Sequence, residues 1–334
     1  MHHIAGQGLE RITGLSMRAR HLIAPAILGG AAMAALAFAG TMVMTSAAGA
    51  QSRSDEQACV NGRDDRYVIS ACSRILASGL RDPHNKAITY YNRGLAYFRL
   101  KMYEHAASDY SQALRLHPTM ATAVYNRAVV YHHMKRYRLA IADYSQTIGL
   151  NSKASLAYYS RGLAYSALKD YPKAIADYDT ALRMNPKADP VYYVRGVAYM
   201  GMRQYGKAIA DLTRAIKISG QPKYYGKRAL AHYRRGDVHE AIKDYDEAIQ
   251  LKPTEANFYV QRGRSFFKLK QYGRSIRDYD QAIKIDPRYN QAYAARGFAY
   301  EKLGRQARAL QDFKRAVALK KAKLRDLRAK NHKR

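Results

Sequence analysis

The chain has 334 residues, of which 57 are Lys or Arg and 26 are Asp or Glu, giving a formal net charge of +31. Its 48% hydrophobic content is enough for a large buried core. Two cysteines without an accompanying histidine cluster argue against a metal site. The sequence also lacks a glycine-rich phosphate loop, a nucleophile elbow and a zinc-type His/Glu spacing, so we expect no catalytic residues and no cofactor.

The first fifty residues differ from the rest of the chain. Arg18 and Arg20 precede an uncharged run from Leu22 to Met44, and small residues then continue to Ala50. This pattern is typical of a secretory signal peptide over residues 1–50, cleaved after Ala50, with Met17 as a possible true start. We therefore expect a periplasmic or secreted protein. The alternative is an uncleaved membrane anchor formed by residues 22–44, a run long enough to span a bilayer.

Residues 51–86 are expected to form an N-terminal cap. Cys59 and Cys72 are the two cysteines of the chain, so only one intramolecular disulfide is possible, and export favours its formation. Arg66 to Ser78 has the apolar spacing of a helix. We expect this helix to cover the end of the first hairpin described below, with the disulfide fixing the preceding extended segment across it.

From residue 87 onward, one pattern recurs every 33 or 34 residues, and the segment from Ser155 to Ala188 shows it best. Tyr158, Gly162 and Tyr165 lie on one face of a first helix, while Ala174 begins a similar apolar face on a second. Small residues stand where the two helices must approach closely, and tyrosines fill the remaining space. The pattern predicts a helical hairpin, which needs neighbours on both sides to bury its faces.

Seven such units follow one another. They cover about residues 87–120, 121–154, 155–188, 189–221, 222–255, 256–289 and 290–320, and a basic tail occupies 321–334. The pattern YxxRGxAY followed by AIxDYxxAIxLxP closely resembles the tetratricopeptide repeat. The resemblance implies an all-α, right-handed α-solenoid of stacked helical hairpins, with a concave groove that mostly holds other proteins or peptides.

Two charged positions recur in every repeat, an arginine on the first helix and an aspartate on the second. Both border the buried stripes, and charges partly removed from water need partners. We therefore expect a structural ladder of Arg–Asp ion pairs, formed either within each repeat or with the preceding one. The residues concerned are Arg93, Arg127, Arg161, Arg195, Arg228, Arg262, Arg296, Asp109, Asp143, Asp177, Asp211, Asp244, Asp278 and Asp312.

A second set of first-helix residues, one step around from the buried stripe, is expected to line the groove. It is aromatic in the early repeats and basic in the later ones, a surface suited to an extended peptide. The alternative is that many of the tyrosines pack against the neighbouring helix. The candidate ligand-binding residues are Tyr91, Tyr125, Tyr159, Tyr193, Phe98, Tyr233, Phe267, Arg234, Lys268 and Lys302. Some family members grip a C-terminal carboxylate with Lys and Asn, but Tyr159 and Leu163 occupy two of those positions, so this activity is not implied.

The positive charge is concentrated toward the C-terminus. Lys and Arg minus Asp and Glu gives 8 − 3 = +5 for Ala256 to Tyr289 and 14 − 3 = +11 for Asn290 to Arg334. No Gly or Pro follows Gly304, so we expect the last helix to continue into the basic tail. This end is either a solubilising cap or a contact for an anionic lipid or polysaccharide surface or an acidic protein. The export signal and the lack of a nucleic-acid motif argue against nucleic acid.

The sequence thus predicts a non-catalytic protein-interaction scaffold of the cell envelope that binds a peptide or protein segment in its groove. A small-molecule substrate is not expected. The alternative function is a peripheral protein that adheres to anionic lipid or polysaccharide through its basic C-terminal third, with the repeats as a spacer.

Overall fold

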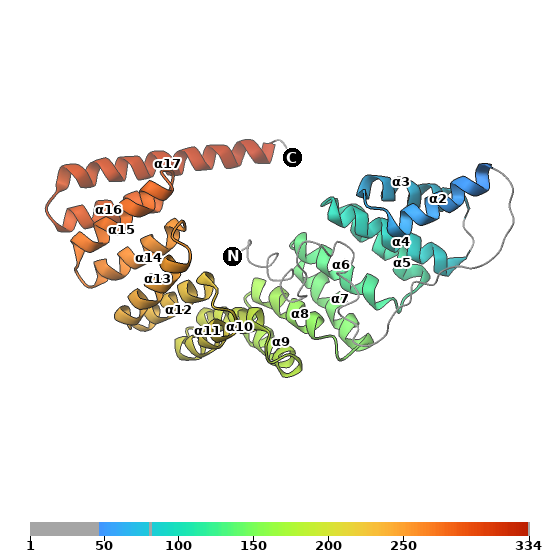
Figure 1. Cartoon of the computed structure of the whole chain (residues 1–334), viewed down its shortest axis with the longest axis horizontal. Helices are drawn as coiled ribbons and strands as arrows, with labels where there is room; N and C mark the ends of the chain where they lie inside the picture. Colours follow the sequence, from blue (N-terminus) through green and yellow to red (C-terminus); the bar gives the residue numbers. More distant parts are fainter. Residues whose placement is uncertain (1–46, 80–81, 333–334) are drawn as a thin grey trace. The chain divides into compact units, whose positions relative to one another are not determined.

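The computed structural model describes residues 47–79 and 82–332, and in these ranges it contains sixteen helices and no strand (Figure 1). This confirms the all-α fold of stacked helical hairpins. Across the same residues, no helix is both long enough and apolar enough to cross a membrane. The alternative anchor, residues 22–44, lies outside the described residues. So does the predicted signal peptide, except for residues 47–50 at the start of the first described helix.

The chain divides into two compact units, residues 1–191 and 192–334, and the boundary falls within α10 (Asp189–Gly201). Unit 1 contains α2 (Ala47–Asn61), α3 (Asp65–Ala77), α4 (Pro83–Arg99), α5 (Tyr103–Leu116), α6 (Ala121–His133), α7 (Tyr137–Leu150), α8 (Ser155–Ala167) and α9 (Tyr171–Met184). Unit 2 contains α11 (Tyr205–Ser219), α12 (Pro222–Arg235), α13 (Val238–Leu251), α14 (Ala256–Lys268), α15 (Tyr272–Ile285), α16 (Asn290–Lys302) and α17 (Gln306–His332).

The α8–α9 hairpin confirms the predicted packing of small residues against large ones. Ala174 is fully buried at the helix contact, and a Cβ atom placed on Gly162 would stand 2.5 Å from Cε1 of Tyr178. Real Cβ atoms do not approach so closely, so the glycine is what allows the tyrosine ring to lie against the first helix. Within each unit, a second helix then packs on the first helix of the following hairpin, as α5 does on α6 and α15 on α16.

The turn between the two helices of a hairpin has a left-handed residue at a fixed place. Lys169 has φ of 63° there, and its N–H and that of Asp170 bond to the carbonyls of Ser166 and Tyr165. Left-handed backbone costs a residue with a Cβ about 1–2 kcal/mol. The equivalent left-handed residues in the other repeats are Lys101, Lys135, Arg203 and Lys270. In the fifth and seventh repeats the position is occupied by a glycine, Gly236 or Gly304.

The N-terminal cap is a pair of helices, α2 and α3, joined by the predicted disulfide between Cys59 and Cys72. The expectation of an extended segment before α3 was wrong, because Cys59 lies in α2. This helix is mostly polar and buries only Asp55, Ala58 and Cys59 among its described side chains. The Nε atom of Arg74 in α3 donates to Oδ2 of Asp55 at 2.8 Å, so an ion pair and a disulfide together attach α2.

The last helix, α17, runs without interruption from Gln306 to His332. Its length confirms the expected continuation of the seventh repeat into the basic tail. It packs on α16, whose Gly297 faces the Phe313 ring in the same way as Gly162 faces Tyr178.

Candidate protein-binding surfaces

The Arg–Asp ladder is formed in all seven repeats, and each pair lies within one repeat. The arginine Nε donates to aspartate Oδ2 at 2.7–2.9 Å and Nη2 donates to Oδ1 at 2.6–2.9 Å, so every pair is bidentate. The aspartates are only 4–7% exposed. In the third repeat, the hydrogen bonds with Asp177 raise the pKa of the Arg161 guanidinium. The ladder therefore fixes the two helices of each hairpin to one another.

The remaining arginine donor, Nη1, reaches the preceding hairpin. In the third repeat, Arg161 Nη1 donates to Ser145 Oγ at 2.9 Å, two residues after Asp143. The other acceptors at this position are Ser111, Thr213, Asp246 and Asp280, and Ser73 of α3 serves the first repeat. The sequence left open whether each arginine pairs within its repeat or with the preceding one. The ion pair lies within the repeat, and Nη1 also bonds to the preceding helix pair in Arg93, Arg127, Arg161, Arg228, Arg262 and Arg296.

Three of the four tyrosines predicted to line the groove are buried instead. Tyr125, Tyr159 and Tyr193 are 1–3% exposed, so their rings do not offer a free surface. The physical reason is contact with the adjacent hairpin: Tyr125 Oη lies 3.1 Å from Ser160 Oγ. The fourth, Tyr91, is half-buried and its hydroxyl accepts a hydrogen bond from Asn126 at 3.0 Å. The assignment of Tyr125, Tyr159 and Tyr193 to ligand binding is therefore wrong, and their role is packing.

Phe98 belongs to a small aromatic cluster in unit 1. Its ring centroid lies 5.4 Å from that of His133 on α6 and 5.9 Å from that of Tyr103 on α5. His133 stacks on Tyr103 at 5.3 Å, and its neighbour His132 is more deeply buried. Burial lowers the pKa of His132 to about 4, so the imidazole is neutral at physiological pH.

The predicted basic residues of the later repeats, Arg234, Lys268 and Lys302, occupy equivalent positions at the ends of the first helices α12, α14 and α16, and α12 contacts α14 while α14 contacts α16. Lys268 Nζ stands 4.8 Å from the centroid of the Tyr233 ring, a cation–π contact across two helices. Phe267 is half-buried, while Arg234 and Lys302 are exposed. We call this group the first-helix surface of unit 2.

Two further cations on the same first helices were missed in the sequence. Arg264 lies three residues before Phe267 and is exposed, and Lys227 is half-buried on α12, where burial lowers its pKa. Burial raises the pKa of Tyr289, and the nearby positive charge of Arg264 partly offsets this rise, which places the two side chains near one another. The helical spacing of Arg264 relative to Phe267 would have identified it, whereas nothing in the pattern singles out Lys227.

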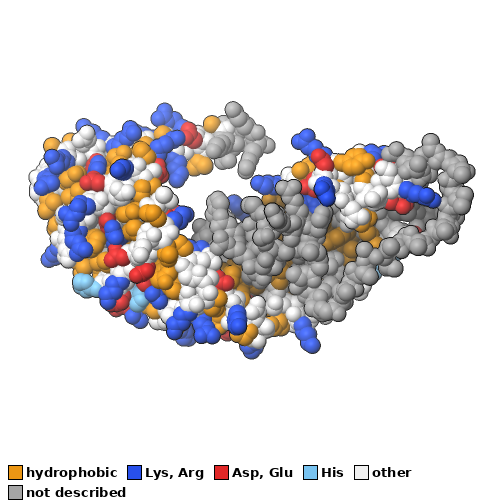
Figure 2. All heavy atoms as spheres, viewed as in Figure 1, with side chains coloured by type: hydrophobic (Ala, Val, Ile, Leu, Met, Phe, Trp, Pro, Cys, Tyr) orange, Lys and Arg blue, Asp and Glu red, His pale blue; other side chains and the backbone are white. Residues whose placement is uncertain are grey.

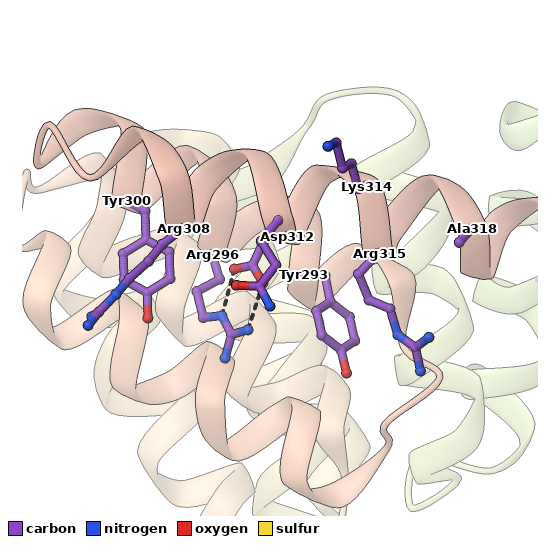
Figure 3. Close-up of a pocket in the computed structure, with 9 residues that line it drawn as sticks. Tyr293, Arg296, Tyr300, Arg308, Asp312, Lys314, Arg315 and Ala318 are labelled. Carbon is purple, nitrogen blue, oxygen red and sulfur yellow. Dashed lines mark hydrogen bonds and ion pairs between the residues drawn. The ribbon is translucent and has the colours of Figure 1, made fainter.

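A pocket of about 670 Å³ lies between α16 and α17 (Figure 3). Figure 3 shows the Arg296–Asp312 ion pair between the rings of Tyr293 and Tyr300, with the long side chain of Arg308 beside Tyr300. Arg315 and Lys314 complete the basic lining. The lining is mainly basic and aromatic, and the carboxylate of Asp312 is already paired with Arg296, so its chemistry suits contact with an anionic group.

Comparison with known proteins gives the family. Models described as tetratricopeptide repeat or TPR repeat match residues 87–120, 121–153, 155–188, 189–222, 229–270, 263–304 and 291–323. The first and third of these ranges coincide with the predicted repeats. No protein with a curated description matches the chain.

Several solved structures share the fold. A tetratricopeptide repeat protein from Parabacteroides merdae is 20% identical, with a TM-score of 0.58 over 75% of this chain and 99% of that one. PilF of Pseudomonas aeruginosa is 19% identical, with a TM-score of 0.52 over 63% of this chain and 97% of that one. A chain of the APC/C Cut9–Hcn1 hetero-tetramer is 16% identical, with a TM-score of 0.52 over 76% of this chain and 50% of that one.

The fold supports a role in binding other proteins, since tetratricopeptide repeats are typically non-catalytic scaffolds. The seven hairpins, their recurrent Arg–Asp pairs and the family models across residues 87–323 lead to one conclusion: the chain belongs to the tetratricopeptide-repeat family.

Proposed function

We propose that this protein is an exported, non-catalytic scaffold of the cell envelope that holds an acidic segment of a partner protein across the first-helix surface of unit 2. The observation that carries the proposal is a group of cations on these first helices beside the half-buried aromatic rings of Tyr233 and Phe267. Among the described residues, Lys227, Arg264, Lys268 and Lys302 form no ion pair with a carboxylate. A surface of this kind attracts a ligand that supplies the missing negative charge.

The contacts of these residues explain why a carboxylate would bind here. Lys268 lies over the Tyr233 ring, which leaves ammonium protons directed to solvent. Arg264 bonds only weakly to the neutral amide of Gln261, at 3.5 Å, so its guanidinium keeps donors for a bidentate contact. Tyr233 and Phe267 add apolar area beside these charges. An extended segment that alternates acidic and apolar side chains matches this arrangement.

Export is supported by the cysteine chemistry as well as by the first fifty residues. Cys59 and Cys72 form a disulfide, and such bonds persist in oxidising compartments such as the periplasm. The scaffold would therefore meet its partner in the envelope or outside the cell.

The test is capture of envelope proteins by the immobilised chain, compared between two charge-reversal variants. Arg264→Glu/Lys268→Glu changes the first-helix surface, and Arg277→Glu/Lys284→Glu makes the same change in charge on exposed residues of α15 in the same repeat. We expect the first variant to lose the captured partner and the second to retain it at about 0.1 M salt, while screening at about 0.5 M salt should weaken capture by the unchanged chain as well.

The same experiment separates this proposal from the alternative function. Adhesion to anionic lipid or polysaccharide through the basic C-terminal third would fade steeply with salt and would weaken equally in both variants. Equal loss in the two variants would therefore reject the first-helix surface as a specific site.

A further inference from the structure

The exposed side of α17 carries a row of three apolar side chains. Leu310, Val317 and Leu324 are 55%, 53% and 48% exposed. Residues spaced seven apart lie on one face of a helix, so the three side chains form a continuous stripe. We call this stripe the apolar row.

Earlier second helices have apolar residues at the positions equivalent to Leu310 and Val317, and a following hairpin covers them in each unit; Leu324 lies beyond the length of those helices. Leu114 of α5, equivalent to Val317, is 9% exposed and packs with Val124 of α6. Ile276 of α15, equivalent to Leu310, is 8% exposed and shares a buried cluster with Ala292 of α16. The apolar row thus lies on the face that receives a helix elsewhere in the fold. On α17, no helix of the described residues covers it.

A second row, four residues further along, is basic. Lys314, Lys321 and Arg328 are again spaced seven apart, and all are exposed. We call them the basic row. Within residues 47–79 and 82–332, none of the three has an ion pair. Orange and blue side chains are correspondingly mixed along the C-terminal helix in Figure 2.

Lys314 indicates which kind of helix fits this face. The equivalent residues of earlier repeats accept a hydrogen bond from an arginine Nη1 of the next first helix, at 2.6–3.1 Å; they are Ser111, Ser145, Thr213, Asp246 and Asp280. A lysine ammonium has no acceptor and would repel that arginine. A further repeat of the same kind, including one from a second copy, is therefore mismatched at this position. A helix that brings a carboxylate is matched.

We propose that this face of α17 is the docking site for an acidic amphipathic α-helix of a partner protein. The apolar side of the helix would cover the apolar row, and its carboxylates would pair with the basic row. The two rows together extend about 27 Å, the length of a helix of about 18 residues. The site lies on a second helix and does not depend on the first-helix surface of unit 2.

The probe is a synthetic three-heptad peptide with leucine at the first and fourth positions of each heptad and glutamate at the flanking positions. Its binding to the full chain is followed by fluorescence anisotropy. We expect Lys314→Glu/Lys321→Glu/Arg328→Glu to weaken binding by about tenfold or more, and Leu310→Gln/Val317→Gln/Leu324→Gln to do the same. All six residues are exposed, so the fold tolerates both changes, which circular dichroism checks.

The matched control is Arg308→Glu/Arg315→Glu/Lys323→Glu, which changes the charge equally at exposed positions outside the two rows. We expect it to change the affinity by less than about threefold. Equal weakening by the control, or equally tight binding of a peptide with lysine in place of glutamate, would overturn the proposal. Three other results would also overturn it. One is self-association of the chain through the apolar row in analytical sedimentation, and another is no detectable peptide binding at about 1 mM. The third is that the variants of the two rows lose binding to anionic phosphatidylglycerol vesicles but not to the peptide.

Discussion

Arg161 connects three helices through one guanidinium group. Nε and Nη2 donate to Asp177 on α9, and Nη1 donates to Ser145 on α7, while the residue itself belongs to α8. Because the same arrangement recurs within each unit, these buried charged residues join the two helices of a hairpin and also bond the hairpin to the one before it. These buried pairs are therefore not available to partners, unlike the exposed cations of the first-helix surface of unit 2 and of α17.

Asp177→Asn should destabilise unit 1 markedly. The substitution leaves the Arg161 charge in a half-buried site without its carboxylate, and breaking a buried pair in this way costs about 2–4 kcal/mol after allowance for the partial exposure of the arginine. Urea unfolding measures the loss. The control is Glu104→Gln, which breaks the exposed pair with Arg136 and should cost less than about 1 kcal/mol. Similar midpoints for the two variants would show that the ladder is not structural.

The hairpins and the ladder were predictable because their residues recur with the repeat. Gly162 and Ala174 mark the close approach of two helices, and a charge repeated in every unit belongs to the architecture. The acceptor for arginine Nη1 was not predictable, since serine, threonine and aspartate alternate there. Whether Tyr125 is exposed in the groove or buried was ambiguous, because a groove position and a position covered by the next hairpin are neighbours around the helix. Helix α2 was missed because it buries very few side chains.

Lys169→Gly should raise the stability of the chain by about 0.5–1 kcal/mol. The residue adopts a left-handed backbone with φ of 63°, which glycine adopts without strain, although part of the gain is offset by the greater freedom of glycine in the unfolded chain. The fifth and seventh repeats already have glycine at this place. Differential scanning calorimetry gives the shift.

A substitution by glycine at Arg277, in the middle of α15, should have the opposite effect. Glycine in a helix interior costs about 1 kcal/mol relative to a good helix former, so Arg277→Gly should lower the melting temperature. If Lys169→Gly also lowered it, the strain at the turn would be less than the cost in entropy.

Acidification should destabilise unit 1 through His132. Burial, with a smaller contribution from the charge of His133, lowers its folded-state pKa to about 4, below the unfolded value of about 6.5. The folded state therefore favours the neutral ring: the stabilisation is complete above about pH 6.5 and is lost as the pH falls toward about 4. The loss should be on the order of 1–3 kcal/mol.

The variant His132→Phe tests this assignment, because the first repeat has Phe98 at the equivalent position. Its stability should fall less between about pH 7 and pH 5 than that of the wild-type chain. His239→Gln, at an exposed site of α13, should leave the profile unchanged. An unaltered pH dependence in His132→Phe would assign the acid sensitivity to other groups.

Removal of the disulfide should release α2 while leaving the repeats folded. Cys59 and Cys72 close a short loop, so the bond contributes about 3 kcal/mol in the chain-entropy description. Without the disulfide, α2 is held only by the ion pair between Arg74 and Asp55 and by a few buried side chains. These contacts contribute little stability to a mostly polar helix. Hydrogen exchange of Cys59→Ser/Cys72→Ser should lose protection in α2 and in the N-terminal part of α3. The helices from α5 onward should keep theirs, because the ladder holds each hairpin independently of the cap. Loss of protection along the whole of unit 1 would instead mean that the cap is required for the fold of the repeats beside it.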